Sequence, residues 1–446
     1  MNIKVGFVSL GCPKNLMNTE RMLALLAAEG FEIVAEDVEA DVMVINTCAF
    51  IESAKTEAID SILDIAWLKE HHTLKGIVVA GCLPQRYGDE ILKELPEVNC
   101  IIGTGSVEKI CEAVRAAYHG TSYRAFDDID TAPFGGERVV TTPEHFAYLQ
   151  ISEGCDNCCT YCVIPSIRGK FRSRPMSDLV EEATELAELG IKELCLIAQD
   201  TTRYGEDLYG TYALDSLIAE LSQIEGIEWI RLHYLYPDMI TDELIEVIAN
   251  EPKIVKYIDL PIQHINDRVL KAMNRRGTGA EIRALFTKLR ERIPNLVIRT
   301  SLITGFPGET DEEFEELCEF LLEYKLERAG VFAYSPEPGS VAGAMEDQVD
   351  EDVKRRRLEL LTDLQMRVVD EYCENQVGKE MTVLCEGYDD ETELFFGRSE
   401  YDSPGIDGIV HFEGEEGGVR PGDFYRVKIT STYDGELIGV IANEEE

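Results

Sequence analysis

Three closely spaced cysteines form the most chemically informative stretch of the chain. Cys155, Cys159 and Cys162, here called the loop triad, have the spacing C-x3-C-x2-C when Cys158 is set aside. Thiolates this close can bind three irons of a 4Fe-4S cluster, which leaves the fourth iron open to a small molecule. The stretch follows a strand-like run at 146–152 and precedes a segment broken by Pro and Gly. We therefore expect a loop on which the thiols converge.

Two other metal or thiol chemistries fit part of this stretch. It contains two C-x2-C pairs, Cys155/Cys158 and Cys159/Cys162, which are also found in zinc sites and redox proteins. A structural zinc site needs four ligands, usually from two such pairs some distance apart in the sequence. Here both pairs lie within 155–162, and the chain has no distant second pair. The cluster is the favoured interpretation, zinc and thiol redox chemistry remain alternatives, and Cys158 has no assigned role.

Three further cysteines follow three predicted strands in residues 1–120. Cys12, Cys48 and Cys82, here called the strand-end triad, each come within three residues of a buried apolar run. Helical patterns separate these runs, which indicates a parallel sheet whose strand carboxyl ends form a ligand crevice. One such cysteine is often only a buried apolar residue. Three at equivalent positions predict a second three-thiolate site, whereas the cysteines inside other strands and helices are expected to pack.

The residues around both triads resemble one family. The segments 10–15 (LGCPKN), 46–48 (NTC) and 81–87 (GCLPQRY), together with the loop triad, are similar to radical S-adenosylmethionine (SAM) methylthiotransferases over essentially the whole chain. Pro-Lys-Asn after the first cysteine and Gln-Arg-Tyr after the third resemble the RimO branch, which modifies an aspartate of a small-subunit ribosomal protein. The branch that modifies transfer RNA typically has Gln-Met-Asn at the first position.

This resemblance implies the chemistry and its cofactors. It implies two 4Fe-4S clusters, SAM, and replacement of a hydrogen on the aspartate β-carbon by a methylthio group. The loop-triad cluster would reduce SAM to a 5′-deoxyadenosyl radical, and the strand-end cluster would present the methylated sulfur. We expect cluster-borne chemistry without a catalytic side chain, and an electron donor such as flavodoxin or ferredoxin. The positions that would contact SAM are Tyr161, Gln199, Arg231 and Gly305.

The chain is predicted to be an α/β protein with several domains. Residues 1–120 should form a parallel α/β sheet domain, and 121–145, which mix Asp, Thr, Pro and Gly, a linker. About six βα units in 146–375 predict a partial (βα)6 radical SAM barrel with its chemistry at the strands' carboxyl ends. Short alternating strands in 376–446 predict a small antiparallel β-barrel, in the position of the family's TRAM domain.

Charge bears on the partner. The chain has 85 acidic and 42 basic residues, a net charge of −43, which repels phosphate backbones. Residues 376–446 carry 18 acidic and 5 basic side chains, a net charge of −13, which suits a Lys/Arg-rich protein loop. We therefore expect a basic ribosomal protein substrate, free or on the small ribosomal subunit, and no direct binding of nucleic acid. General solubility is the alternative explanation of the charge.

Several features have a structural or a different functional alternative. The basic runs 168–174 and 354–357 are expected to be solvated faces, although the first could hold a carboxylate of SAM or of the target. For Arg231 a structural hydrogen bond is an equal alternative to a ligand contact. The turn 304–310 lacks the Gly-Lys-Ser/Thr of a phosphate loop. Methylthiolation of transfer RNA adenosine and a redox sensor without turnover are the alternative functions.

Location follows from the remaining composition. Hydrophobic residues make up 45% of the chain, but no run of eighteen apolar residues predicts a membrane span. The first residues read directly into a strand rather than an export signal. We therefore expect a cytoplasmic protein with reduced thiols and no membrane partner.

Overall fold

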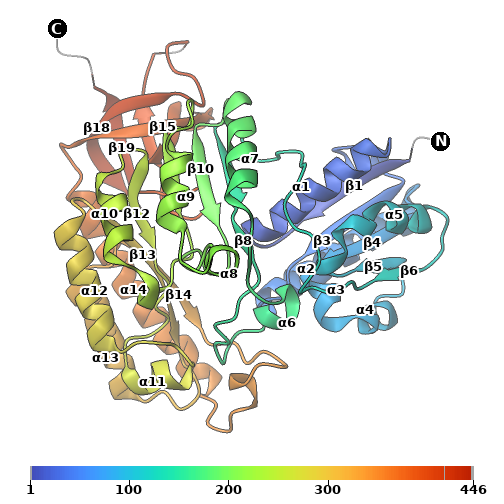
Figure 1. Cartoon of the computed structure of the whole chain (residues 1–446), viewed down its shortest axis with the longest axis horizontal. Coiled ribbons are helices and arrows are strands. Elements are labelled where there is room, and N and C mark those ends of the chain that lie inside the picture. The colour runs from blue at the N-terminus through green and yellow to red at the C-terminus, as the bar shows by residue number, and fades with distance from the viewer. Residues whose placement is uncertain (1–2, 416, 443–446) are drawn as a thin grey trace.

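A computed structural model describes residues 3–415 and 417–442. Figure 1 shows a blue-to-cyan sheet domain, a central green-to-orange domain and a red barrel beyond it. The first sheet has six parallel strands in the order β2 (Glu32–Ile33), β1 (Lys4–Ser9), β3 (Val42–Thr47), β4 (Gly76–Gly81), β5 (Cys100–Ile102) and β6 (Tyr123–Ala125). Its helices are α1 (Pro13–Ala28), α2 (Glu52–His71), α3 (Cys82–Tyr87), α4 (Asp89–Glu94) and α5 (Ile110–Tyr118).

The middle strands of this sheet are buried along their whole length. Every residue of β3 and β4 is buried, as expected for parallel strands that are covered on both faces. One apolar cluster packs α2 on the sheet, and a second packs α1 and α5 on it. The strand ends are thereby fixed by packing on both sides, which makes this edge a rigid support for side chains.

The sheet extends beyond its expected boundary. Residues 121–145 are predicted to be a linker, but Tyr123–Ala125 forms β6, which pairs in parallel with β5. A three-residue strand is too short to show an apolar alternation, so the sequence gives no signal for it. The segment after β6 then crosses to the central domain.

The central domain is a six-stranded parallel sheet, which confirms the partial barrel. Its order is β14 (Arg328–Ala333), β13 (Val297–Thr304), β12 (Ile254–Asp259), β11 (Trp229–Leu232), β10 (Glu193–Ile197) and β7 (Phe146–Gln150). A two-stranded hairpin, β8 (Ser152–Glu153) and β9 (Arg172–Ser173), follows β7. The helices are α6 (Ile164–Arg168), α7 (Met176–Glu188), α8 (Glu206–Tyr209), α9 (Leu214–Leu221), α10 (Asp242–Asn250), α11 (Asp267–Ala272), α12 (Gly279–Arg292), α13 (Asp311–Tyr324) and α14 (Glu351–Glu374).

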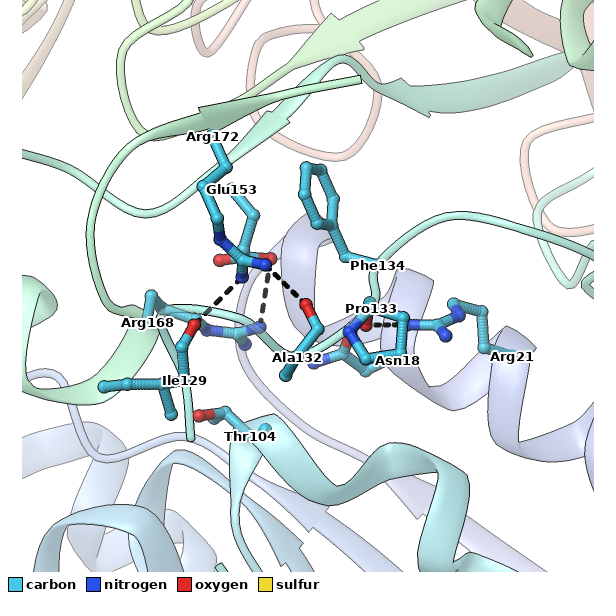
Figure 2. A pocket seen from close by; sticks show the side chains of 11 residues that line it. Asn18, Arg21, Thr104, Ile129, Ala132, Pro133, Phe134, Glu153, Arg168 and Arg172 are labelled. Carbon is cyan, nitrogen blue, oxygen red and sulfur yellow. Dashed lines mark hydrogen bonds and ion pairs between the residues drawn. The ribbon is translucent and has the colours of Figure 1, made fainter. Parts of the chain in front are cut away.

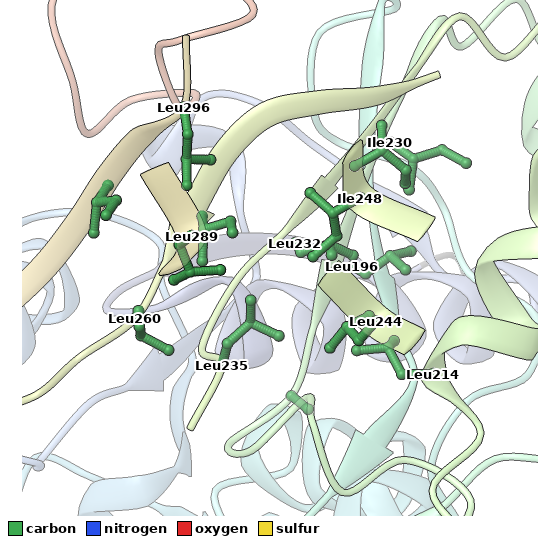
Figure 3. Packing of buried hydrophobic residues seen from close by; sticks show 14 of the residues in the cluster. Leu196, Leu214, Ile230, Leu232, Leu235, Leu244, Ile248, Leu260, Leu289 and Leu296 are labelled. Carbon is green, nitrogen blue, oxygen red and sulfur yellow. The ribbon is translucent and has the colours of Figure 1, made fainter. Parts of the chain in front are cut away.

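Leucine and isoleucine side chains fill the space between these strands and helices. Figure 3 shows Leu196, Leu232 and Leu260 of the strand region beside Leu244 and Leu289 of the surrounding helices. Two of the helices begin at a threonine capping box, in which the threonine and a glutamate three residues later satisfy free backbone N–H groups. Packing and capping together fix where each strand ends and the next helix begins.

The C-terminal strands form the predicted closed barrel, with one difference. The order is β15 (Glu380–Asp389), β16 (Leu394–Ser399), β17 (Val410–Glu413), β19 (Glu436–Ile441) and β18 (Phe424–Tyr433). The barrel is expected to be antiparallel, but β17 and β19 pair in parallel. Alternation along a strand is the same for both pairing directions, so the pattern could not distinguish them.

The barrel is joined to the central domain by buried ion pairs. Glu193 contacts Arg231 and Arg398, both at 2.7 Å, and all three side chains are almost completely buried. Burial would raise the pKa of Glu193, but Arg398 and Arg231 beside it lower it to about 2. A second buried pair joins Arg328 to Asp402 at 2.6 Å. These contacts fix the barrel on the central sheet. No helix within the described residues is long and apolar enough to cross a membrane.

Candidate active site

The strand-end triad lies at one edge of the first sheet. Ser9 is in register with Asn46, and Thr47 with Gly81, so β1, β3 and β4 end side by side. Cys12 precedes α1, Cys48 follows β3, and Cys82 is the first residue of α3. Gly11 has a φ of +87°, and a Cβ on it would lie 2.6 Å from the Cβ of Cys48. The chain therefore needs glycine here to bring the first cysteine against the second.

Buried amide groups hold this edge in place. Asn46 donates from Nδ2 to the carbonyl of Asn15 at 2.8 Å and to the hydroxyl of Thr19 at 2.9 Å. Asn15 donates in turn to the carbonyl of Leu10 at 2.7 Å. These bonds tie the start of α1 to the end of β3, and so fix Cys12 relative to Cys48.

The loop triad is held by backbone contacts with its surroundings. The N–H of Cys155 donates to Gly169 O at 3.1 Å, and the N–H of Cys162 donates to Cys159 O at 3.0 Å. A Cβ on Gly154 would lie 2.0 Å from Lys170 O, and its φ is +82°. This close approach admits only glycine and brings the start of the loop against the strand that follows it.

Both triads line one cavity of about 350 Å3 between the first sheet and the central barrel. The first sheet domain contributes the strand-end triad together with Lys14 and Phe50. The central domain contributes the loop triad and, among others, Tyr161 and Gln199, which were predicted to contact SAM. The structure thus brings all six predicted cysteines to one space, although the sequence did not show whether the two sites meet.

Two arginines place positive charge beside the thiols. Arg168 Nη2 lies 3.6 Å from Cys82 Sγ, and Arg168 also pairs with Glu153 at 3.6 Å. Arg275 Nη1 lies 4.0 Å from Cys159 Sγ, and its guanidinium stacks on the ring of Tyr236. Each triad therefore has an arginine beside it that can offset the negative charge of thiolates.

Neither cysteine triad forms a site for a single metal ion. Within the described part of the chain, no three His, Cys, Asp or Glu side chains gather closely enough to hold one metal ion. In a 4Fe-4S cluster each cysteine binds its own iron, so the thiols stand farther apart than the ligands of one zinc ion. Burial raises the pKa of Cys48 and Cys155 to about 11 and that of Cys162 to about 12. Bare thiolates are thus disfavoured, and iron would supply the charge that stabilises them.

The cavity also offers unpaired acceptors and strained backbone. Asn157 Oδ1 and Gln199 Oε1 are buried without a hydrogen-bond partner among the described residues, and both side chains line the cavity. These acceptors fit the hydroxyl and ammonium donors of SAM. Tyr234 and Gln263, which also line the cavity, have positive φ angles of 60° and 71°. Such strain in residues other than glycine is typical of functional sites.

Arg231 and Gly305 lie elsewhere, contrary to the prediction that they contact SAM. Arg231 is fully buried; it pairs with Glu193 and donates to Glu400 O at 3.0 Å, in the interface with the barrel. The N–H of Gly305 donates to a carboxylate oxygen of Glu309 at 2.6 Å, and its Cα faces Lys354 of α14. Both residues lie near the carboxyl end of a strand, β11 for Arg231 and β13 for Gly305, but the sequence does not show which side of the sheet they face.

The first basic run secures the segment that crosses between the domains. Figure 2 shows Arg172 donating to the carbonyls of Ile129 and Ala132, and Arg21 of α1 donating to that of Pro133. These residues surround a small pocket of about 20 Å3, which Arg168 and Glu153 also line. The run is therefore largely structural, and only Arg168 of this run reaches the six-cysteine cavity.

Half of the second basic run is buried. Lys354 is 1% exposed and Arg357 is 7% exposed, although both were expected on a solvated face. Arg357 pairs with Glu309 at 2.5 Å and with Asp311 at 2.7 Å. Half of the run thus fixes α14 to the turn after β13.

Three cavity cations were not predicted from the sequence: Lys14, Arg275 and Arg299. Lys14 lies in the segment 10–15 that resembles the family, but the sequence alone does not mark it as a site residue. Arg275 lies three residues after α11 and Arg299 lies in β13, and nothing in their spacing relates them to either triad. Only the tertiary fold brings them together.

Family models match three parts of the chain. Residues 4–103 match the Uncharacterized protein family UPF0004, residues 149–321 the Radical SAM superfamily, and residues 377–442 the TRAM domain. These ranges correspond to the first sheet domain, the central barrel and the C-terminal barrel.

Curated relatives match over nearly the full length. The chain is 48% identical to the ribosomal protein uS12 methylthiotransferase RimO of Geotalea uraniireducens, over 98% of both chains. It is 45% identical to the protein of that name from a Thermoanaerobacter species, over 98% of this chain and 99% of the relative. A Clostridium perfringens protein of the same name is 48% identical, over 99% of this chain and 98% of the relative.

Solved structures share the fold. The radical S-adenosylmethionine methyltransferase TsrM from Kitasatospora setae, with cobalamin and a [4Fe-4S] cluster bound, superimposes with a TM-score of 0.57 at 14% identity, covering 77% of this chain and 74% of that chain. At this identity the likeness shows only that the architecture is shared.

Proposed function

The chain belongs to the family of ribosomal protein uS12 methylthiotransferases RimO, and on that premise we propose that it methylthiolates the β-carbon of an aspartate in this small-subunit ribosomal protein. It is a radical SAM methylthiotransferase by its family and its domains. The observation that carries the finer proposal is the single cavity lined by both triads. A sulfur-inserting reaction needs two reactive centres that reach the same carbon atom, and one shared cavity supplies that proximity.

Each triad would hold one 4Fe-4S cluster by its three thiolates. The loop triad would hold the cluster that binds SAM, and the strand-end triad the auxiliary cluster. When bound, these groups and SAM supply the electron, the hydrogen-abstracting radical, the sulfur and the methyl group. Asn157 Oδ1 and Gln199 Oε1 would accept hydrogen bonds from SAM.

The protein's own side chains control the charge and water content of the cavity. Arg168 and Arg275, both from the central domain, stand beside thiols of the two different triads, where they can offset thiolate charge. Phe50, Leu235 and Pro261 give the wall apolar surface. Such surface disfavours water, which would otherwise compete for a reactive intermediate.

The acidic barrel supports a basic protein substrate. Its acids divide into two groups: Glu386, Asp402 and Asp407 contact residues of the central domain, whereas others remain exposed to solvent. The exposed acids are Glu380, Asp390, Glu391, Glu393, Glu413, Glu415, Asp423 and Asp434. These carboxylates would attract Lys and Arg side chains and repel the phosphates of RNA.

An electron donor such as flavodoxin or ferredoxin would supply the reducing electron.

The proposal is tested by a choice of substrate. Reconstituted protein is incubated anaerobically with SAM, a chemical reductant, sulfide, and either a uS12 loop peptide with the target aspartate or an anticodon stem-loop RNA. Mass spectrometry should show a methylthio group in place of one hydrogen on the peptide and no change in the RNA. A matched peptide with asparagine at the target position controls for modification elsewhere.

A modified RNA with an unmodified peptide would contradict the proposed substrate while leaving radical SAM chemistry in place. Clusters that change oxidation state without any cleavage of SAM would contradict turnover altogether and favour a redox sensor.

A further inference from the structure

Four cationic side chains line the six-cysteine cavity, and three of them have partners within the chain. Arg168 and Arg275 stand beside the thiols as described above. Arg299 donates from Nη1 to Asp259 Oδ1 at 2.9 Å. Each arginine therefore interacts with another group of the protein, whereas the fourth cation, Lys14, has no hydrogen-bonded anionic or thiol partner among the described residues.

Lys14 is buried in the cavity wall without an anionic partner. Its residue is 8% exposed, and its Nζ lies 3.3 Å from the centre of the Tyr234 ring. Within 3–415 and 417–442, no residue forms a hydrogen bond or ion pair with its ammonium, whose contact is the Tyr234 ring. A buried charge without a counterion is unfavourable, since it loses hydration and gains nothing in return. The ring alone compensates only part of that loss.

Two carboxylates, those of Glu153 and Asp259, act electrostatically on this ammonium, and both have other partners. Glu153 accepts hydrogen bonds from the side chains of Gln150 at 2.5 Å and Gln199 at 2.7 Å, and it pairs with Arg168. Asp259 accepts from Arg299 and from the N–H of Tyr234 at 3.1 Å. Neither carboxylate is left free to pair with the lysine, and the thiol of Cys12, the other group beside it that can become anionic, is a proposed cluster ligand. The ammonium is therefore available to an anion from outside the chain.

The Tyr234 ring that Lys14 contacts is held in place by its backbone. Tyr234 follows β11 with a φ of 60°, and the bond from its N–H to Asp259 holds this strained backbone. Its ring therefore supports a side chain that reaches across from α1 of the first domain. An ammonium held in this way can orient a small anion, because neither the cation nor its support is free to move away.

We propose that Lys14 binds the side-chain carboxylate of the target aspartate and thereby selects it, a role that rests on the function proposed above. The β-carbon is bonded directly to that carboxylate, so fixing the carboxylate limits the β-carbon to a small volume. Lys14 is two residues from Cys12, on the domain of the auxiliary site, whereas the loop triad has Arg275 as its own cation. SAM also carries a carboxylate, which Lys14 could bind instead of the aspartate. The experiment below distinguishes these two carboxylates.

The test compares Lys14→Met with the matched variant Lys170→Met. Methionine keeps an unbranched chain but removes the charge, and Lys170 is an exposed lysine outside the cavity, so its loss controls for net charge. Anaerobic fluorescence anisotropy of the cluster-loaded proteins measures affinity for two uS12 loop peptides that differ only in aspartate or asparagine at the target. Isothermal titration with SAM is run on the same samples.

We expect the wild type and Lys170→Met to bind the aspartate peptide about 10- to 100-fold more tightly than the asparagine peptide, the usual range for a desolvated charge-assisted bond. Lys14→Met should bind both peptides equally and bind SAM as the wild type does. A Lys14→Met protein that keeps the aspartate preference contradicts the proposal, and weakened SAM binding in it would assign the carboxylate to SAM instead.

Two further readings keep the result interpretable. Iron content and melting temperature show whether Lys14→Met is folded; if it is not, equal affinity of the wild type for both peptides would by itself contradict the proposal. Turnover separates this inference from the proposed function. Equal kcat/KM of the wild type and Lys14→Met on the aspartate peptide would overturn only the lysine's role, whereas no modification by the wild type would overturn both.

Discussion

The two triads reach the same cavity by opposite routes. The strand-end triad comes from three parallel strands far apart in sequence, so its geometry depends on the register of a sheet that is buried on both faces. The loop triad comes from eight consecutive residues, so its geometry depends on one loop and its backbone contacts. Two of the strand-end cysteines, Cys48 and Cys82, are buried, whereas Cys12 and all three loop cysteines are partly exposed. One site is thus a property of the fold, and the other is a property of a local segment.

This difference suggests a division of roles. A partly exposed loop site suits a cluster that must admit SAM and receive an electron. A site at the edge of a rigid sheet suits a cluster that must hold sulfur at a fixed place. The following experiments test that division, from the largest expected effect to the smallest.

The largest contrast is between single cysteines of the two triads. Cys159→Ala should reduce SAM cleavage to background, because the loop triad would lose its cluster. Cys12→Ala should retain SAM cleavage near the wild-type rate but form no methylthio product. Chromatography of cleaved SAM and mass spectrometry of the peptide measure the two steps. Loss of both steps in both variants would show that the triads do not have separate roles.

Two glycines test whether the sites are built independently. Gly154→Ala and Gly81→Ala each place a Cβ against a backbone oxygen, at 2.0 Å and 2.7 Å, in a backbone with positive φ. Strain of about 1–3 kcal/mol or more should result in each case. We expect iron content to fall by about half in each variant, with the loss confined to the nearer triad. Iron analysis combined with SAM cleavage distinguishes which cluster is lost.

The two arginines beside the thiols should have smaller effects. Arg168→Gln and Arg275→Gln each remove a positive charge beside one triad. Because groups around metal ligands typically change metal affinity about 10- to 100-fold, each variant should lose its adjacent cluster more readily to a chelator. Iron release during titration with a chelator measures this. If Arg168→Gln destabilised both clusters equally, the sites would be coupled rather than separate.

The smallest effect is expected at Cys158. It is exposed, has a φ of 50°, and offers its carbonyl to Asn274 at 3.0 Å, while its thiol does not line the cavity. Cys158→Ser should therefore leave iron content and SAM cleavage unchanged. A variant with half the iron would mean that the loop holds its cluster through a different set of cysteines.

The same difference explains what could be predicted from the sequence. The loop triad is visible as spacing, and the strand-end triad follows from three apolar runs that each end before a cysteine. Lys14, Arg275 and Arg299 could not be related to either triad, because only the packing of two domains brings them to one cavity. Arg231 was assigned to SAM because it lies towards the carboxyl end of a predicted strand, but its side chain points to the barrel interface, where it pairs with Glu193. Sequence patterns locate the ends of strands, whereas the face of the sheet on which a side chain lies and the residues that it contacts depend on tertiary structure.

The most direct test of this account is the iron inventory of the anaerobically reconstituted protein, measured by iron analysis and Mössbauer spectroscopy. We predict about eight irons per chain in two 4Fe-4S clusters, and about four when Cys12, Cys48 and Cys82 are all replaced by alanine. About four irons in the wild type, unchanged by that triple substitution, would contradict the claim that two cluster sites share the cavity.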